Sequence, residues 1–402
     1  MHLGVILDRL GKDLGGAEAH TDALVRRALE AGDRVSVACL EGETAPGATR
    51  VAFGRVPRTR PARDRHLADV GERALRAAGC DVVLAVRHAL RCDVYLPHGG
   101  LVADAWAARD ASRGGAGPLA RLAARWSRKR RFFLDAERAL LGAASGPRVV
   151  AVSRGLAARI GAVYPTARAR TVVVPNGVDA DRFDPAPFAA GRAATRRAHG
   201  VPDDAYVGLV LAHDPWLKGL QAVLDAMAHP DVASLSPSFH LVVAGKRSGA
   251  DVVAAARHGR VEARVHLAGA VADPRPLYAA ADVLVQPTWY DPCSLVALEA
   301  LAMGVPVVTT PRNGVWELMG MRGGISIEAP GDVLGVVHAL RVLADPALRR
   351  VTSDDARYVA CKTRLSTRLD QVLDVCRGPS ARRAPVVAEA DDLGPPADPC
   401  LA

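Results

Sequence analysis

The 402-residue sequence predicts an α/β protein made of two successive domains, each with a parallel sheet wrapped by helices. Three observations support this prediction. Short β-branched runs alternate with longer segments rich in Ala and Leu, turn-forming residues interrupt this alternation at 175–179, and the alternation begins again at residue 206. Hydrophobic residues make up 50% of the sequence, so a chain of this length can bury two complete cores.

In the first half, short apolar runs predict the strands and the longer segments between them predict the helices. We expect strands at 3–7, 35–40, 50–53, 81–86, 93–96, 149–153 and 171–174. We expect helices at 17–31, 65–78 and 102–144, the last one broken near 114–118. The turn sequence Pro175-Asn176-Gly177-Val178-Asp179 ends this first unit.

The second half has the same alternation of strands and helices. We expect strands at 206–212, 239–245, 265–268, 283–286, 305–309 and 324–328, with helices filling the gaps. The proline-free segment 365–375 predicts a terminal helix. From residue 378 onward, Pro, Ala and charged residues follow one another without periodicity, which predicts a disordered tail.

Composition excludes several classes of protein. No apolar stretch reaches the roughly 18 residues that a membrane span needs, and residues 1–7 lead straight into a predicted strand, unlike a secretory signal. The seven cysteines lack paired short spacings, which excludes a disulfide framework and a zinc site. We therefore expect the protein in a reducing cytoplasm.

The most informative segment is 281–310, where a strand, a polar loop, a helix and a second strand predict a βαβ unit. Asp291 lies in the loop, and Glu299 follows eight residues later in the helix. The free N-terminus of such a helix attracts anionic ligands. Glu299 shares a helix face with Leu295, where a buried charge is unfavourable unless it has a polar partner. A pair of sugar hydroxyls is one such partner.

This segment resembles the acid-x7-acid signature of the family 4 retaining glycosyltransferases. These enzymes have the GT-B fold, in which two Rossmann-like domains with parallel sheets face each other across a cleft. The sequences 289–292 and 297–308 are most similar to those of the lipopolysaccharide core glucosyltransferases of the family. Both acids of the signature are usually glutamate, so Asp291 departs from the pattern and has a shorter reach. The sequence 175–179 resembles the family's interdomain hinge.

The resemblance implies a division of the chain. Residues 1–175 form an acceptor-side domain, 176–360 a nucleotide-sugar donor domain, 361–377 a helix that crosses back to the first domain, and 378–402 a disordered tail.

Two loops that follow predicted first strands offer groups for a diphosphate. Gly15 and Gly16 let the backbone approach a phosphate closely, although the loop is neither a Walker A motif nor a dinucleotide fingerprint. The loop resembles the family's first-domain glycine loop; a plain turn is the alternative. Lys218 can neutralise a leaving diphosphate and matches the family's lysine; a surface lysine at a helix start is the alternative. The arginine that often precedes this lysine is missing, and Arg247 or Arg312 could replace it.

His98 ends a predicted strand at the edge where open α/β sheets bind ligands. The resemblance places it near the donor sugar, whereas a lone histidine is more often structural. The resemblance also places Arg247 and Val271 beside the donor nucleotide, where backbone groups around 270–271 could bind a uracil edge.

A basic segment with aromatic residues lies in the region 121–138. We define the basic patch as Arg125, Trp126, Arg128, Lys129, Arg130, Arg131 and Phe132. One interpretation is an interfacial helix on an anionic membrane. A nucleic-acid surface is a second, but no known motif accompanies the patch and we expect no nucleic-acid partner. A solvated, arginine-rich helix is the third.

The resemblance implies a retaining transferase that moves a hexose, with glucose expected, from a nucleotide diphosphate sugar to a glycolipid or polysaccharide, lipopolysaccharide core in particular. A UDP-sugar is the expected donor. We expect no cofactor and no metal, because an Asp-x-Asp motif is missing from the matched segment. A catalytically silent GT-B subunit that binds a partner or a membrane, and a GT-B nucleotide-sugar epimerase, are the alternatives.

The predicted site follows from these motifs. The catalytic residues are Asp291, Lys218 and His98. The donor-binding residues are Gly15, Gly16, Lys218, Arg247, Val271, Asp291, Cys293, Ser294, Leu295 and Glu299.

Overall fold

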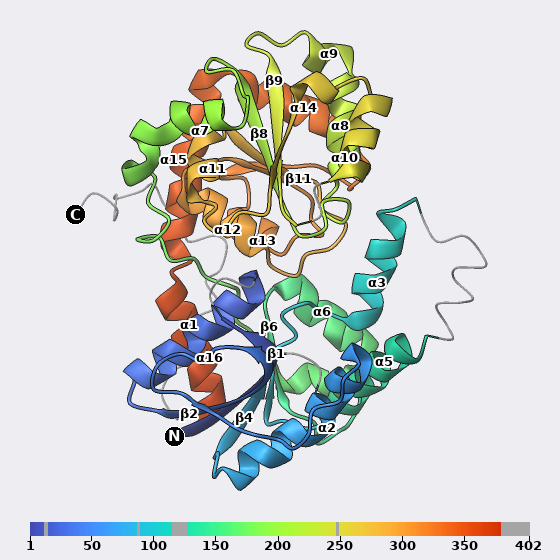
Figure 1. Ribbon diagram of the computed structural model, residues 1–402, viewed down its shortest axis with the longest axis vertical. Helices are drawn as coiled ribbons and strands as arrows, with labels where there is room; N and C mark the ends of the chain where they lie inside the picture. Colours follow the sequence, from blue (N-terminus) through green and yellow to red (C-terminus); the bar gives the residue numbers. More distant parts are fainter. Residues whose placement is uncertain (12–14, 87–88, 115–126, 247–248, 379–402) are drawn as a thin grey trace.

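The computed structural model describes residues 1–11, 15–86, 89–114, 127–246 and 249–378. These residues form two parallel sheets, of seven and six strands, which lie one above the other along the long axis of the molecule (Figure 1). Helices cover the faces of both sheets (Figure 1). The predicted α/β class with parallel sheets is therefore confirmed. We call the parts built on the two sheets the first and second domains.

The first sheet has the strand order β3-β2-β1-β4-β5-β6-β7. Its strands are β1 (His2–Leu10), β2 (Arg34–Gly42), β3 (Thr49–Arg50), β4 (Val82–Ala85), β5 (Val94–Tyr95), β6 (Arg148–Ala151) and β7 (Thr171–Val173). Every neighbouring pair is parallel, with Leu3 opposite both Val35 and Val82. The central β1 extends three residues beyond its predicted end. The edge strand β3 contains only Thr49 and Arg50, whereas a strand over residues 50–53 is predicted.

The helices of the first domain follow the predicted alternation. They are α1 (Gly16–Glu30), α2 (Arg60–Ala77), α3 (Val102–Ala111), α5 (Arg128–Leu141) and α6 (Arg154–Val163), followed by the short η1 (Pro165–Arg170). The predicted helical region 102–144 thus contains α3 and α5, and residues 115–126 between them lie outside the described residues.

The second sheet has the strand order β10-β9-β8-β11-β12-β13. Its strands are β8 (Tyr206–Leu211), β9 (Phe239–Ala244), β10 (Val265–Gly269), β11 (Val283–Gln286), β12 (Val307–Thr309) and β13 (Gly324–Ser326). The elements around it are η2 (Ala186–Gly191), α7 (Arg192–Ala198), α8 (Leu220–Ala228), α9 (Pro230–Ala233), α10 (Ala250–His258), η3 (Glu262–Arg264), α11 (Arg275–Ala280), α12 (Leu295–Ala302), α13 (Trp316–Met319), α14 (Val333–Ala344) and α15 (Pro346–Lys362).

The chain crosses between the domains twice, and the two crossings pair with each other. The backbone carbonyl of Val178 accepts a hydrogen bond from the Leu365 N–H at 2.9 Å, and the Val178 N–H donates one to the Thr363 carbonyl at 2.9 Å. Gly177 permits this approach, because a Cβ there would lie 2.6 Å from Leu365 Cα. The last helix, α16 (Leu365–Arg377), then packs against α1, β4 and β6 of the first domain (Figure 1).

Both cores consist largely of Ala, Val and Leu side chains. Leu298, Ala300 and Leu301 of α12 are fully buried, so this helix is fixed against the second sheet and α15. The rigid position of α12 determines where its polar residues, Ser294 and Glu299, can lie.

Candidate active site

The carboxyl ends of β1, β8 and β11 lead into loops that meet between the two domains. A Cβ built on Gly15, after β1, would lie 3.4 Å from Nε2 of His213, after β8. A Cβ built on Gly16 would lie 3.0 Å from Leu295 Cδ1 at the start of α12. The glycine loop of the first domain therefore faces the second domain so closely that larger side chains would collide. This is where open α/β sheets bind their ligands.

Two of the predicted catalytic residues form an ion pair at this place. Lys218 Nζ donates a hydrogen bond to Asp291 Oδ2, and both side chains are largely buried. Gly219 fixes the lysine loop, because its φ is +84° and a Cβ there would lie 2.1 Å from the Pro287 carbonyl oxygen. The Asp291 N–H donates to the Arg312 carbonyl at 3.1 Å. Both charged groups are therefore held by loops whose backbones are fixed.

Glu299 has a protein partner that the sequence analysis did not identify. The Tyr278 hydroxyl, from α11, donates to Glu299 Oε2 at 2.8 Å. Burial of the carboxyl group raises the pKa of Glu299 to about 7, against the opposing effects of Tyr278 and of the Arg182 charge. Among the described residues, no hydrogen bond reaches Glu299 Oε1. One carboxyl oxygen of Glu299 is thus oriented by the protein.

The N-terminus of α12 is partly occupied by protein groups. The Ser294 hydroxyl caps the helix by accepting from the Ala297 N–H at 3.2 Å. The backbone N–H of Ser294, a predicted donor-binding residue, donates to Asn313 Oδ1 at 3.2 Å. Asn313 is fully buried and its amide needs partners. Cys293 is buried, and its backbone carbonyl accepts a hydrogen bond from Asn176 Nδ2 at 2.7 Å. Leu295, the next predicted donor-binding residue, faces the glycine loop.

His98 follows β5 and lies beside α1. Its ring centroid is 5.2 Å from that of His20, a buried histidine of α1. Burial, together with the charge of His98, lowers the pKa of His20 to about 3, so that ring is neutral. Val271 follows β10 and is half-buried against the core. The predicted donor residue Arg247 lies outside the described residues.

Three further contacts join the domains, and the sequence analysis identified none of them. The Leu101 N–H donates to the Tyr290 hydroxyl at 2.9 Å. Glu317 of α13 accepts from the N–H groups of Arg154 and Gly155, each at 2.6 Å, at the start of α6. The third contact is an ion-pair cluster, in which Asp214 lies 3.0 Å from Arg109 and 3.2 Å from Arg113. Of these residues, only Tyr290 lies inside a recognised motif.

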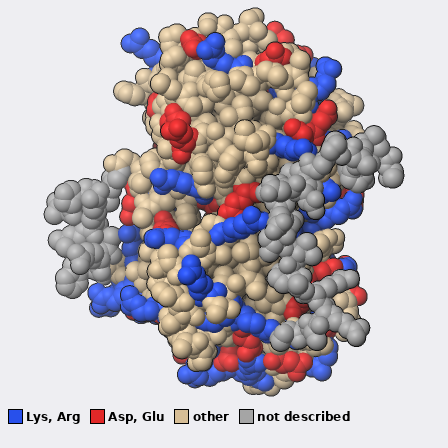
Figure 2. All heavy atoms as spheres, turned by 180° about the vertical axis from the view of Figure 1, so that it is seen from behind, with Lys and Arg blue, Asp and Glu red and all other residues tan. Residues whose placement is uncertain are grey.

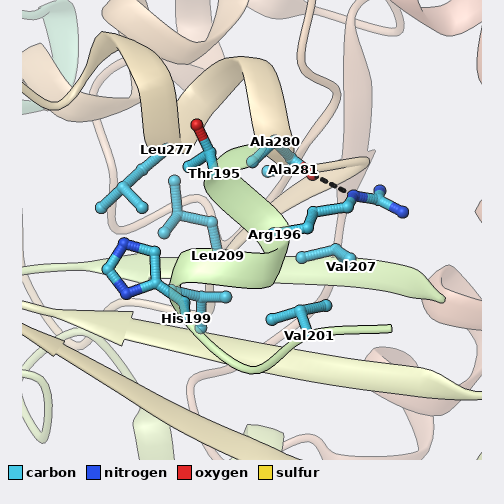
Figure 3. Close-up of a pocket in the computed structure, with 10 residues that line it drawn as sticks. Thr195, Arg196, His199, Val201, Val207, Leu209, Leu277, Ala280 and Ala281 are labelled. Atoms are coloured by element: carbon cyan, nitrogen blue, oxygen red, sulfur yellow. Dashed lines mark hydrogen bonds between the residues drawn. The ribbon is translucent and has the colours of Figure 1, made fainter. Parts of the chain in front are cut away.

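Two cavities differ in what they can hold. The larger, of about 520 Å³, lies between the domains and is lined by Asp291 together with residues of α3, α6 and α13. The smaller, of about 10 Å³, lies in the second domain beneath α7, where Arg196 and His199 line it with apolar side chains (Figure 3). A volume of that size holds at most one water molecule. Of these two cavities in the described part of the chain, the larger one alone has room for a sugar ring.

The basic patch is only partly available as a surface. Arg128, Lys129 and Arg131 of α5 are exposed. Arg130 pairs instead with Asp110 at 3.1 Å, and Phe132 is half-buried with the Arg65 guanidinium 5.4 Å from its ring centroid. The predicted patch residues Arg125 and Trp126 lie outside the described residues.

Charged side chains of both signs lie along the band between the domains, as Figure 2 shows for one face. No helix in the described part of the chain has the length and apolar character needed to cross a membrane. Within the same residues, no three His, Cys, Asp or Glu side chains are grouped so that they could hold a metal ion.

Two family models match the chain, one on each domain. The model described as Glycosyltransferase Family 4 matches residues 14–182, and that described as Glycosyl transferases group 1 matches residues 205–345.

Curated relatives share about a third of their residues with the chain in the matched regions. Glycogen synthase of Mycobacterium tuberculosis is 36% identical over 48% of this chain and 47% of that protein. D-inositol 3-phosphate glycosyltransferase of Geodermatophilus obscurus is 34% identical over 42% of this chain and 40% of that protein. Lipopolysaccharide glucosyltransferase WaaG of Escherichia coli is 27% identical over 54% of this chain and 58% of that protein. The chain thus spans about half the length of the curated relatives it matches.

Solved structures resemble the whole fold. The crystal structure of WaaG, a glycosyltransferase involved in lipopolysaccharide biosynthesis, superimposes with a TM-score of 0.79 at 21% identity, covering 94% of this chain and 100% of that one. Anabaena HepE in complex with UDP-glucose superimposes with a TM-score of 0.68 at 16% identity, covering 94% and 100%. At these identities the likeness concerns the fold alone.

Proposed function

Because the chain belongs to family 4 of the glycosyltransferases and has the GT-B fold, we propose that it transfers a hexose from a nucleotide diphosphate sugar to an acceptor hydroxyl. The observation that carries this proposal is the Lys218–Asp291 ion pair, held in the second domain beside the cleft that the Gly15–Gly16 loop closes. A nucleotide sugar offers a partner to each member of this pair. Its diphosphate is an anion for the lysine, and its hexose has hydroxyls that can donate to the carboxylate.

In the proposed complex the donor lies mainly on the second domain. Lys218 binds the diphosphate and stabilises the negative charge that develops on it as the glycosidic bond breaks. Asp291 accepts a hydrogen bond from a hexose hydroxyl, and Glu299, oriented by Tyr278, accepts from the ribose hydroxyls through its remaining oxygen. The glycine loop covers the phosphates from the first domain.

We propose retention of configuration by attack from the face of the leaving group. Retaining glycosidases place two close carboxylates at the scissile bond. Here one carboxylate of the matched signature, Asp291, is paired with a lysine, and the other, Glu299, is bound to a tyrosine. The leaving phosphate oxygen then accepts the proton of the acceptor hydroxyl. Catalysis comes mainly from positioning and from charge stabilisation by Lys218, without a metal ion.

The finer substrate assignments draw on the relatives. HepE is described in complex with UDP-glucose, which supports UDP as the nucleotide and glucose as the hexose. WaaG, described as a lipopolysaccharide glucosyltransferase, supports a lipopolysaccharide core acceptor. The other relatives, a glycogen synthase and an inositol phosphate glycosyltransferase, act on different acceptors, so a polysaccharide acceptor is the second choice. We further propose that the enzyme works in the cytoplasm, in contact with the inner membrane through Arg128, Lys129 and Arg131.

A thermal-shift panel of UDP, GDP, ADP and their glucose conjugates, with and without a chelator, tests the proposal. A ligand at about 100 times its dissociation constant stabilises the folded state by about 2.7 kcal/mol. We expect selective stabilisation by UDP and UDP-glucose that the chelator does not change. A panel in which no nucleotide stabilises the protein would instead favour a catalytically silent subunit. Conversion of the hexose of UDP-glucose into an epimer, with no dependence on an acceptor, would favour an epimerase.

A further inference from the structure

The cavity of about 520 Å³ lies between the two domains. Its first-domain wall is formed by α3 and α6, and its second-domain wall by the loops 289–292 and 311–314 together with α13. In Figure 1, α13 lies at the edge of the second domain that faces α6 of the first domain. Of the predicted donor-binding residues that the structure describes, only Asp291 lines this cavity. The cavity is therefore adjacent to the proposed donor site but distinct from it.

Most of the charges that line the cavity are already paired. Asp104 and Arg159 form two hydrogen bonds with each other, both at 2.8 Å. Asp291 is paired with Lys218, outside the lining. Glu317 accepts from two backbone N–H groups at the start of α6, whose helix dipole favours a negative charge.

Arg312 is the exception. It is exposed, and among the described residues its guanidinium group has no hydrogen-bond or ion-pair partner. Its backbone, in contrast, is fixed, because the Arg312 carbonyl accepts from Asp291 N–H at 3.1 Å and its N–H donates to Thr310 Oγ1 at 3.3 Å. An unpaired cation thus sits on the loop that holds the proposed catalytic carboxylate.

The rest of the lining suits a sugar ring. Trp289 is half-buried on the second-domain wall, and its backbone N–H donates a hydrogen bond to the Leu217 carbonyl at 2.9 Å. Small apolar residues also line the cavity, namely Ala107, Ala108, Ala111, Pro292 and Pro311. A cavity of about 520 Å³ falls within the range of small-molecule sites. An amphipathic ligand with an apolar face for the indole and a polar edge for Arg312 fits this arrangement.

We propose that this cavity binds the acceptor saccharide and that Arg312 binds an anionic substituent on it, a phosphate or a carboxylate close to the hydroxyl that receives the hexose. A guanidinium group matches both anions through paired, charge-assisted hydrogen bonds. The inference rests on the proposed transferase function, and it adds the chemical class of the acceptor. It also assigns Arg312 to the acceptor and not to the donor diphosphate.

The test is a calorimetric titration of the full chain with three probes, glucose 6-phosphate, glucuronate and glucose, with and without saturating UDP. We expect one or both anionic probes to bind about tenfold to hundredfold more tightly than glucose, the range for a hydrogen bond to a charged group. A preference for glucose 6-phosphate alone identifies phosphate as the substituent, and a preference for glucuronate alone identifies carboxylate. Arg312→Gln should remove the preference, and Arg312→Lys should restore part of it.

Arg350→Gln is the matched control, because Arg350 is exposed on α15 and does not line the cavity. It should leave the preference for the anionic probes unchanged. Equal binding of all three probes by the wild type, or an Arg312→Gln variant that loses UDP affinity and keeps the preference, overturns the inference. UDP binding is measured separately in the same samples. A wild type that fails to bind UDP contradicts the proposed function, whereas one that binds UDP but shows no preference contradicts only the anionic acceptor.

Discussion

Lys218 and Asp291, 73 residues apart in the sequence, are joined by an ion pair between the loops that follow β8 and β11. Each side chain neutralises the other in a largely buried place. An isolated charge there would be unfavourable, so the pairing holds both side chains in position. When a donor binds, its anionic diphosphate can replace Asp291 as the partner of Lys218, and a hexose hydroxyl can replace Lys218 as the partner of Asp291. Neither charge is then left unpaired.

Lys218→Ala should lower the turnover of UDP-glucose by about 10²- to 10³-fold, by analogy with the loss of one donor that stabilises a developing negative charge. Nucleotide release at saturating donor measures this effect. Lys362→Ala is the control, because Lys362 is an exposed lysine at the end of α15. A decrease of less than about tenfold would mean that Lys218 does not stabilise the leaving group.

The local parts of this site could be predicted from the sequence, since each depends on a short motif placed after a strand. Lys218, Asp291 and the two glycines lie in such motifs, and the structure brings their loops together at one edge of the cleft. The contacts that complete the site could not be predicted in this way. Tyr278 lies 21 residues from Glu299, and Leu101 lies 189 residues from Tyr290, and no local pattern marks either pair.

The difference between local sequence patterns and contacts over long sequence distances also explains the errors in the predicted strands. The central strand β1 pairs on both sides, so it extends beyond its apolar run to Leu10. The edge strand β3 pairs with β2 alone, through Ser36 and Val37, and ends after Arg50 although the apolar run continues. Strand length here is determined by hydrogen bonding to neighbouring strands, which sequence periodicity does not contain.

Glu299→Gln should change the pH dependence of folding stability. The carboxyl group titrates at 4.5 in an unfolded chain and at about 7 in the folded protein. Between these values the folded state binds more protons than the unfolded state, so this group lowers the free energy of unfolding as the pH rises. The variant carries no titrating group at this position. Urea unfolding across this pH window should therefore show a smaller loss of stability in the variant than in the wild type.

The same variant should also bind UDP more weakly, and the loss should be larger above pH 7 than below it, because the ionised carboxylate is the better acceptor for ribose hydroxyls. Isothermal titration with UDP at one pH below 7 and one pH above 7 measures this effect. Unchanged UDP affinity together with altered unfolding would show that Glu299 is a structural acid.

Gly16→Val should lower the turnover of UDP-glucose by about 10- to 100-fold, because small displacements of a closing loop have effects of this size. A Cβ at residue 16 would lie 3.0 Å from Leu295 Cδ1, so the larger side chain of valine would press against Leu295 at the start of α12. The unfolding temperature should change little, since Gly16 is exposed. The control is Gly191→Val, where no atom lies within 4 Å of the added Cβ. Equal activity of the two variants would show that the cleft does not need to close at Gly16.

Arg128→Gln/Arg131→Gln should strongly weaken cosedimentation of the protein with anionic phospholipid vesicles, because both arginines are exposed on α5 and can contact lipid phosphates. Each such cation contributes about 1 kcal/mol to binding at an anionic membrane, so the loss of two lowers the affinity by about 30-fold. Arg257→Gln/Arg350→Gln removes the same charge from exposed positions of the second domain and should bind vesicles like the wild type. Donor hydrolysis in solution should be the same in all three proteins, which separates membrane binding from catalysis. Equal vesicle binding by both double variants would show that α5 does not contact the membrane and that its arginines are a solvated surface.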